Sequence, residues 1–414
     1  MPNPSSDPFF ASLAGGLSLD PFASFLLAVS VGIGLILWLY SSRFPGTVRF
    51  FFLMLFFFVD AVILFGVDNL VVFYIVWEIA AFFAWGIGRL DAEGTAASGA
   101  WPITVMGLLA SLAMFIGLGA LQQQNGSFSL AALRSDGVEW VSLLLLLAVV
   151  LKSLSLVGQT TREGRRRLGG AAGAFLLSAG VFVIGIYPYG KLLLGGFAAF
   201  ALWREAALWL ALGLAVVSGL AALGEADTRR SLADTALAQL LILFAALALP
   251  RVSGAGLAGG ILFLPVYGLA VVALFVALGL VETSTGERNI ASLGGLAEHL
   301  PFVALVFLVG SLALASLPPL GAFVGQVVIA SSLLRLTSVW PAVLYGFALL
   351  LALLNLLRLF RGIFLGHGEW LAQGRQPRSA DLALATTGVM LALTALLPFW
   401  SAGLVEPVVD HLLR

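Results

Sequence analysis

Two apolar stretches decide the fold class: residues 70–87, LVVFYIVWEIAAFFAWGI, and residues 141–158, VSLLLLLAVVLKSLSLVG. Each is close to the roughly 20 residues that a helix needs to cross the hydrocarbon core of a bilayer. Each also carries one charge, Glu78 in the first and Lys152 in the second. A charge at this depth costs roughly 2.5–3.5 kcal/mol, so an unpaired one rarely persists without a role. Opposite charges on two separate helices therefore predict a path for an ion or a proton.

The composition of the whole chain agrees with a membrane protein that crosses the bilayer many times. Of 414 residues, 61% are hydrophobic and 10% are charged, and the mean hydropathy is +1.07. A soluble domain holds about 25% charged residues, so this chain could not cover itself with a water-facing surface. It has no cysteine, and its three histidines, His299, His367 and His411, fall in predicted loops. We therefore expect no metal, haem, iron–sulfur or nucleotide cofactor, no catalytic chemistry and no nucleic-acid partner.

Apolar runs of about 17–25 residues recur along the chain and predict about twelve membrane spans. Residues 1–18 lack the basic region of a signal peptide and are interpreted as a short tail, so residues 19–414 form one all-α membrane domain. The run at 301–336 is too long for one straight crossing, and Pro318-Pro319 interrupts it. It is predicted to be a broken helix whose second half starts near Leu320, with a simple kink as the alternative. The predicted spans are 19–41, 49–66, 69–88, 101–121, 138–158, 171–191, 206–224, 232–250, 257–282, 301–336, 340–364 and 381–403.

Basic residues are unevenly divided between the two sides that these spans define. Fourteen arginines, including Arg165-Arg166-Arg167, lie on one side and six lysines or arginines on the other, while Lys152 stays within a span. Cytoplasmic loops carry the excess of basic residues. The arginine-rich side is therefore predicted to be cytoplasmic, in a bacterial-type inner membrane, with both termini on the outer side.

Several motifs occur in an order typical of one membrane-protein family. They are the block 49–91 with its Trp77-Glu78 pair, Lys152-Ser153, residues 226–240 (ADTRRSLADTALAQL) and residues 314–323 (LASLPPLGAF). In this order they resemble the antiporter-like subunits of respiratory complex I, Mrp antiporters and energy-converting hydrogenases. The resemblance covers essentially the whole chain from about Leu19. Its first predicted span resembles the family's third helix, so we expect the family's first two helices to be missing.

The resemblance implies a fold, a set of partners and a function. The fold would be all-α, with broken helices and two inverted repeats, a first half at 49–191 and a charge-depleted second half at 206–364, followed by a last helix at 381–403. The partners would be other membrane subunits of a multi-subunit complex, together with the lipid bilayer. The function would be translocation of protons or another cation, with any electron transfer carried out by the partners.

The second half departs from the family pattern at its charged positions. Val271 occupies the position of the eleventh-helix lysine, and Tyr267 stands where a histidine often precedes it. Gln326 replaces the twelfth-helix lysine or glutamate, and Arg229 replaces a motif lysine. Arginine keeps its proton because its pKa exceeds about 12, so Arg229 would shape the local potential without passing protons.

A lysine relay requires an amine that can both hold and release a proton. Burial lowers the pKa of an amine in general and a nearby carboxylate raises it, which suits Glu78 and Lys152 as the relay pair. Asp60, Tyr267, Gln326 and Arg229 are interpreted as a possible secondary path, with Asp60 expected to face a neighbouring subunit or a hydrated groove.

Three alternatives remain open from the sequence. The pair Glu78–Lys152 would also suit a buried ion pair that only fixes helix packing, in a degenerate scaffold subunit without conduction. The chain would also suit the membrane subunit of a two-component inorganic-carbon uptake system with a zinc-containing partner that resembles carbonic anhydrase. The sequence does not choose between H⁺ and Na⁺.

Overall fold

The structure, a computed structural model, describes residues 19–90 apart from 43 and 45, then 101–130, 139–160, 168–194, 200–249, 254–366, 384–389, 391, 394 and 397–413. Within this part of the chain, ten helices are long and apolar enough to cross a membrane. This confirms an all-α membrane protein. The predicted tail at 1–18 and the triple-arginine loop lie outside the described residues.

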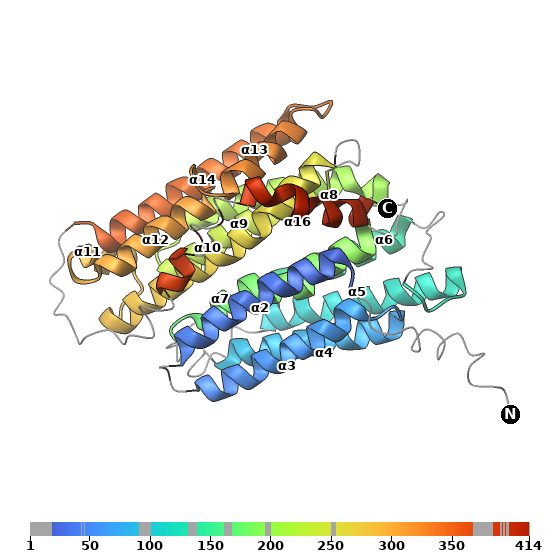
Figure 1. Ribbon diagram of the computed structural model, residues 1–414, viewed down its shortest axis with the longest axis horizontal. Coiled ribbons are helices and arrows are strands. Elements are labelled where there is room, and N and C mark those ends of the chain that lie inside the picture. Colours follow the sequence, from blue (N-terminus) through green and yellow to red (C-terminus); the bar gives the residue numbers. More distant parts are fainter. Residues whose placement is uncertain are drawn as a thin grey trace.

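Five helices make up the first part of the bundle (Figure 1). The first, α2, begins with Asp20, whose carboxylate accepts a hydrogen bond from the N–H of Ala23 at 2.7 Å, and with Pro21, which suits a first helical turn. Antiparallel α3 and α4 meet where Leu53 packs on Gly86 and Phe56 stacks on Phe83. The bounds are α2 Pro21–Ser41, α3 Thr47–Gly66, α4 Leu70–Leu90, α5 Trp101–Asn125 and α6 Glu139–Thr160.

The sixth span is a continuous helical segment that is buried along its length except at Lys191. It begins as a regular turn, α7 (Ala171–Phe175), and then widens into three π-helical pieces, η2 (Leu176–Gly180), η3 (Phe182–Ile186) and η4 (Tyr189–Leu194). Such wide turns leave the backbone imperfectly paired and are frequent at functional sites. We refer to residues 171–194 as the central helix, because it contacts α2, α6 and α10.

The second part of the bundle contains the interrupted helix that the sequence predicts. Helix α12 ends at Leu314, α13 starts at Ala322, and residues 315–321 form the break between them. Both pieces run along α10, where Gly310 packs on Leu274 and Gly325 lies against the carbonyl of Gly259. The bounds are α8 Phe200–Gly224, α9 Thr228–Leu247, α10 Ala255–Thr285, α11 Leu296–His299, α12 Pro301–Leu314, α13 Ala322–Leu333 and α14 Trp340–Phe364.

Two groups of helices are visible in Figure 1, one from blue to green and one from yellow to orange, with α2, α7 and α10 between them. The C-terminal helix α16 (Leu397–Leu413) contacts both α10 and α2 and so joins the two groups. It continues past residue 403, where the sequence places the end of the last span, and residues 381–396 are described only in part.

Candidate functional site: a buried ion pair between helices

Glu78 and Lys152, predicted from separate apolar runs, meet within the first group of helices. The Nζ atom of Lys152 on α6 lies 2.9 Å from both carboxylate oxygens of Glu78 on α4. The two side chains differ in exposure, with 6% of the lysine and 30% of the glutamate exposed on the isolated chain. The carboxylate is therefore the outward member of the pair and the ammonium is the inward member.

A third helix completes the surroundings of the ammonium. The Ser111 hydroxyl on α5 accepts a hydrogen bond from Lys152 Nζ at 2.7 Å and itself donates to the carbonyl of Gly107 at 2.9 Å. The ring of Trp77 lies 4.6 Å from the same nitrogen, where its π-face attracts a cation. Lys152 is thus held by a carboxylate, a hydroxyl and an aromatic ring from two other helices. The sequence analysis did not identify Ser111, whose only signal is a lone serine within an apolar span.

The central helix fixes this site from the inner side. Trp77 donates its indole N–H to the carbonyl of Ile184 at 2.9 Å. A β-carbon on Gly185 would come within 2.3 Å of the Ser153 hydroxyl, so glycine allows α6 to approach here. The wide turn η3 therefore lies directly behind the ion pair.

Asp60 lies inside the chain, which corrects the expectation that it faces a neighbouring subunit or a hydrated groove. Its side chain is buried, and within the described residues its Oδ2 atom has no hydrogen-bond partner. The contacts Leu53–Gly86 and Phe56–Phe83 set the register of α3 against α4 and place Asp60 level with Ile79, next to Glu78. A second acidic group thus occurs at the depth of the pair.

Tyr267 and Gln326 lie beyond the central helix and away from the ion pair. Tyr267 on α10 is fully buried near Phe182, and its hydroxyl has no hydrogen-bond partner among the described residues. The α10–α12 and α10–α13 contacts place it level with the helix break at 315–321. The Gly325–Gly259 contact places Gln326 level with Ala258 of α10, nine residues and roughly 13 Å along that helix from Tyr267. The two residues therefore do not form one polar site.

Arg229 belongs to a separate buried ion cluster. Its Nε and Nη2 atoms donate to the two oxygens of Glu282 at 2.8 and 2.7 Å, and the Nε of Arg288 lies 3.5 Å from the same carboxylate. This fork geometry suits an arginine and not a lysine. Arg229 is thereby committed to Glu282, a partner that the sequence analysis missed because the two lie 53 positions apart.

Among the described residues, no group of three or more histidine, aspartate or glutamate side chains is arranged to hold a metal ion. The chemistry that the described site offers is the exchange of protons between an amine, a carboxylate and a hydroxyl.

Comparison with known proteins identifies the family to which this chain belongs. Residues 67–352 match the family described as "NADH:quinone oxidoreductase/Mrp antiporter, TM". The chain belongs to this family. The matched region contains Glu78, Lys152, Tyr267 and Gln326, and excludes Asp60.

Two proteins of Escherichia coli are similar in sequence to this chain. The chain is 31% identical to formate hydrogenlyase subunit 3 of Escherichia coli over 58% of its own length and 44% of that protein. It is 30% identical to NADH-quinone oxidoreductase subunit L of the same organism, over 73% of its length and 51% of that subunit. The chain thus spans about half the length of these two relatives.

A solved structure shows the same fold. A chain of respiratory complex I from Thermus thermophilus superposes with a TM-score of 0.81 at 22% identity, covering 96% of this chain and 86% of that one. Together with the family match, this confirms the fold class predicted from the sequence.

Proposed function

We propose that this antiporter-family chain translocates protons across the membrane, with Glu78 and Lys152 as the pair that loads them. The observation that carries the proposal is the position of Lys152 Nζ, 2.9 Å from both Glu78 oxygens and 2.7 Å from the Ser111 hydroxyl. An ammonium in this setting holds its proton while the carboxylate stays close. It gives the proton up more readily when the carboxylate is neutralised or moves away.

The difference in exposure gives the pair a direction. Glu78 is the partly exposed member, and Ile75 and Phe82, one turn before and after it, are exposed large apolar residues. This face suits lipid or a neighbouring membrane subunit, and the carboxylate is where a proton would arrive. We propose that the chain works in a multi-subunit assembly in a bacterial-type inner membrane, with both termini outside and with any redox cofactor held by its partners.

The central helix bears on the route that a proton takes after Lys152. The central helix lies between Lys152 and Tyr267, and at the level of η3 it presents Phe182, Val183, Ile184 and Ile186, which carry no polar side-chain atom. Arg229 donates two hydrogen bonds to Glu282. We propose that protons leave on the Lys152 side, through water admitted by the wide turns or through an adjoining subunit. Tyr267 and Gln326 then have structural roles.

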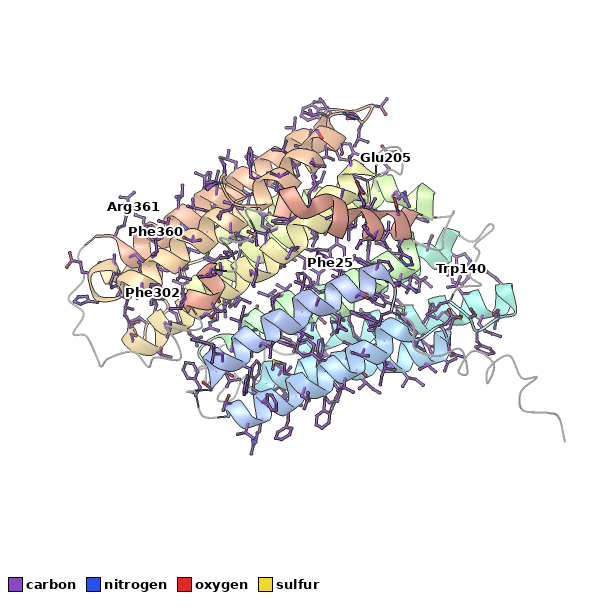
Figure 2. The ribbon with its side chains drawn as sticks, viewed as in Figure 1. Phe25, Trp140, Glu205, Phe302, Phe360 and Arg361 are labelled. Carbon is purple, nitrogen blue, oxygen red and sulfur yellow. The ribbon has the colours of Figure 1, made fainter. Side chains whose placement is uncertain are left out.

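Proton uptake by vesicles tests the proposal. The assembled complex is reconstituted as wild type, Glu78→Gln and Lys152→Met, and the yield of assembled complex is measured beside the flux. Proton transfer by a positioned side chain contributes about 10²–10⁴-fold, so each change should lower flux per assembled complex by at least about a hundredfold. The matched control is Glu205→Gln, which neutralises an exposed carboxylate on α8 (Figure 2).

The alternatives predict other outcomes. A scaffold subunit would lose assembly in both variants and keep normal flux per assembled complex, and normal flux from assembled Lys152→Met would end the relay proposal. Recovery of a zinc-containing partner resembling carbonic anhydrase, in place of redox or antiporter subunits, would favour inorganic-carbon uptake.

A further inference from the structure

A groove with a volume of about 690 Å³ opens beside the last turns of α14. Its walls are formed by Leu354, Leu357 and Leu365 at the end of α14 and by Leu293 in the loop before α11. Two arginines, Arg358 and Arg361, supply its charge, and none of the described residues that line it is an aspartate or a glutamate. The groove is therefore apolar along one part and purely cationic at the other.

Arg358 is held in place by the backbone of the neighbouring helix pair. Its Nη2 atom donates to the carbonyls of Ala222 and Glu225 at 2.9 and 2.7 Å and to the Ser231 hydroxyl at 3.0 Å. Its Nε atom donates to the Asn355 side chain at 3.1 Å. These hydrogen bonds use Nε and Nη2, and Nη1 of Arg358 has no acceptor among the described residues. The guanidinium is thus fixed, and one edge of it remains for a ligand.

Arg361 lies one turn further along the same helix and is exposed. Figure 2 shows it projecting from the outer face of the bundle, beside Phe360. Within the described residues it has no ion-pair partner. Glu225, at the end of α8, accepts a hydrogen bond from the N–H of Asp227 and interacts electrostatically with Arg358. Glu225 thus partly balances the charge of Arg358, and Arg361 is the arginine of the groove that has no ion-pair partner among the described residues.

The positions of the two arginines along α14 indicate what kind of anion would bind in the groove. Arg358 and Arg361 fall in the last two turns of a membrane-spanning helix, on the arginine-rich side, while Leu354 and Leu357 lie toward the membrane centre. Backbone at Gly294 and Gly366 borders the charged end, where neither residue projects a side chain. Basic pockets between helix ends on this side of a membrane suit lipid head groups.

We propose that this groove binds an anionic phospholipid. Its phosphodiester would lie between the free edge of Arg358 and Arg361, and an acyl chain would follow Leu357 and Leu354 toward the membrane centre. The proposal is independent of proton translocation, because the groove is formed by α14 and the loop before α11 and shares no residue with the Glu78–Lys152 site.

Photolabelling of the full chain in its native membrane tests the site. The probe is phosphatidylglycerol with a diazirine in one acyl chain, and adducts are mapped by mass spectrometry. Adducts are expected within residues 354–365. Arg361→Gln should lower their yield by about fivefold, the effect of one arginine near an anionic leaflet. Leu357→Trp, which fills the groove and keeps both charges, should lower it as well.

The matched control is Arg49→Gln, which removes an exposed arginine on the same side of the membrane but outside the groove, and it should leave the yield unchanged. Equal labelling by phosphatidylcholine, or unchanged labelling in Arg361→Gln, would overturn the proposal. So would complete competition by inorganic phosphate, which would indicate a free-phosphate site. A photoreactive residue at position 357 that cross-links to another protein would show that a partner subunit fills the groove.

Discussion

The amine of Lys152 has three polar or aromatic neighbours, each a different residue type. Glu78 supplies charge, Ser111 an oxygen that also donates to its own helix, and Trp77 a π-face. Breaking a buried pair from one side leaves an uncompensated charge. A variant that changes the chemistry of Lys152 and keeps its charge therefore complements the charge-removing variants.

Lys152→Arg provides such a test. Arginine retains the positive charge and can pair with Glu78, but its pKa above about 12 prevents it from releasing the proton. We expect assembly close to wild type and flux lowered to the level of Lys152→Met, measured as acidification of vesicles that contain equal amounts of complex. Ser111→Ala, which removes one acceptor and no charge, should keep most of the flux. Wild-type flux in Lys152→Arg would contradict a relay through the amine.

Arg229 should behave in the opposite way, because its role is structural. Arg229→Met leaves Glu282 with Arg288 as its remaining partner, at 3.5 Å. Loss of one partner of a buried pair costs about 3–5 kcal/mol, so the thermal midpoint in detergent should fall clearly. The double change Arg229→Met with Glu282→Leu removes both charges and should recover much of the loss. If the single variant melts like the wild type, the cluster contributes little to stability.

At the scale of the helices, the two parts of the bundle are joined by close backbone contacts. A β-carbon on Gly279 of α10 would lie 1.5 Å from the carbonyl oxygen of Gly169, which leads into the central helix. The Tyr40 hydroxyl of α2 donates to that same carbonyl at 2.9 Å. Three segments far apart in the sequence therefore meet at one peptide group.

Gly279→Ala should disrupt this junction. The methyl group would collide with backbone, which cannot rotate away as a side chain can, so we expect low yield of folded protein and a lower thermal midpoint. Gly213→Ala on α8 is the matched control, since its β-carbon would meet nothing within 4 Å and alanine favours a helix by about 1 kcal/mol. Equal stability of the two variants would show that α10 can move away from residue 169 at little cost.

Asp20 joins two other elements to the start of α2. Its carboxylate caps the helix and lies 3.2 Å from Lys191 Nζ and 3.3 Å from His411 Nε2 of the C-terminal helix. Asp20→Ala removes both functions, whereas Asp20→Asn keeps a good cap and loses the charge. The cap is worth about 1 kcal/mol. We expect Asp20→Ala to have the lowest thermal midpoint of the three proteins, and equal midpoints for Ala and Asn would exclude a contribution from the cap.

At the scale of the whole molecule, the orientation that we propose for the chain in the membrane rests on the distribution of its arginines. Because the chain contains no cysteine, single cysteines report their side without further engineering. Ser42→Cys and Gln123→Cys are both exposed sites, at the ends of α2 and α5. We expect a membrane-impermeant maleimide added outside intact cells to label the residue at 123 and to leave the residue at 42 unlabelled. The reverse pattern would overturn the orientation and the outer position of both termini.

The sequence alone determined the fold class, the approximate spans, the interrupted helix at Pro318-Pro319 and the pair Glu78–Lys152. These features depend on local composition: apolar length, proline and the high cost of a charge in the bilayer are all readable from neighbouring residues. The family resemblance was readable for the same reason, since its motifs are short and keep their order.

Only the tertiary structure decided which side chains meet. It paired Arg229 with Glu282, added Ser111 to the lysine site, buried Asp60 beside α4 and separated Tyr267 from the ion pair by the central helix. It also brought Arg358 and Arg361 to one groove with the loop before α11. Helical periodicity shows that a residue lies on a buried face, but the neighbour across that face is set by how helices distant in sequence pack, and that information is not local.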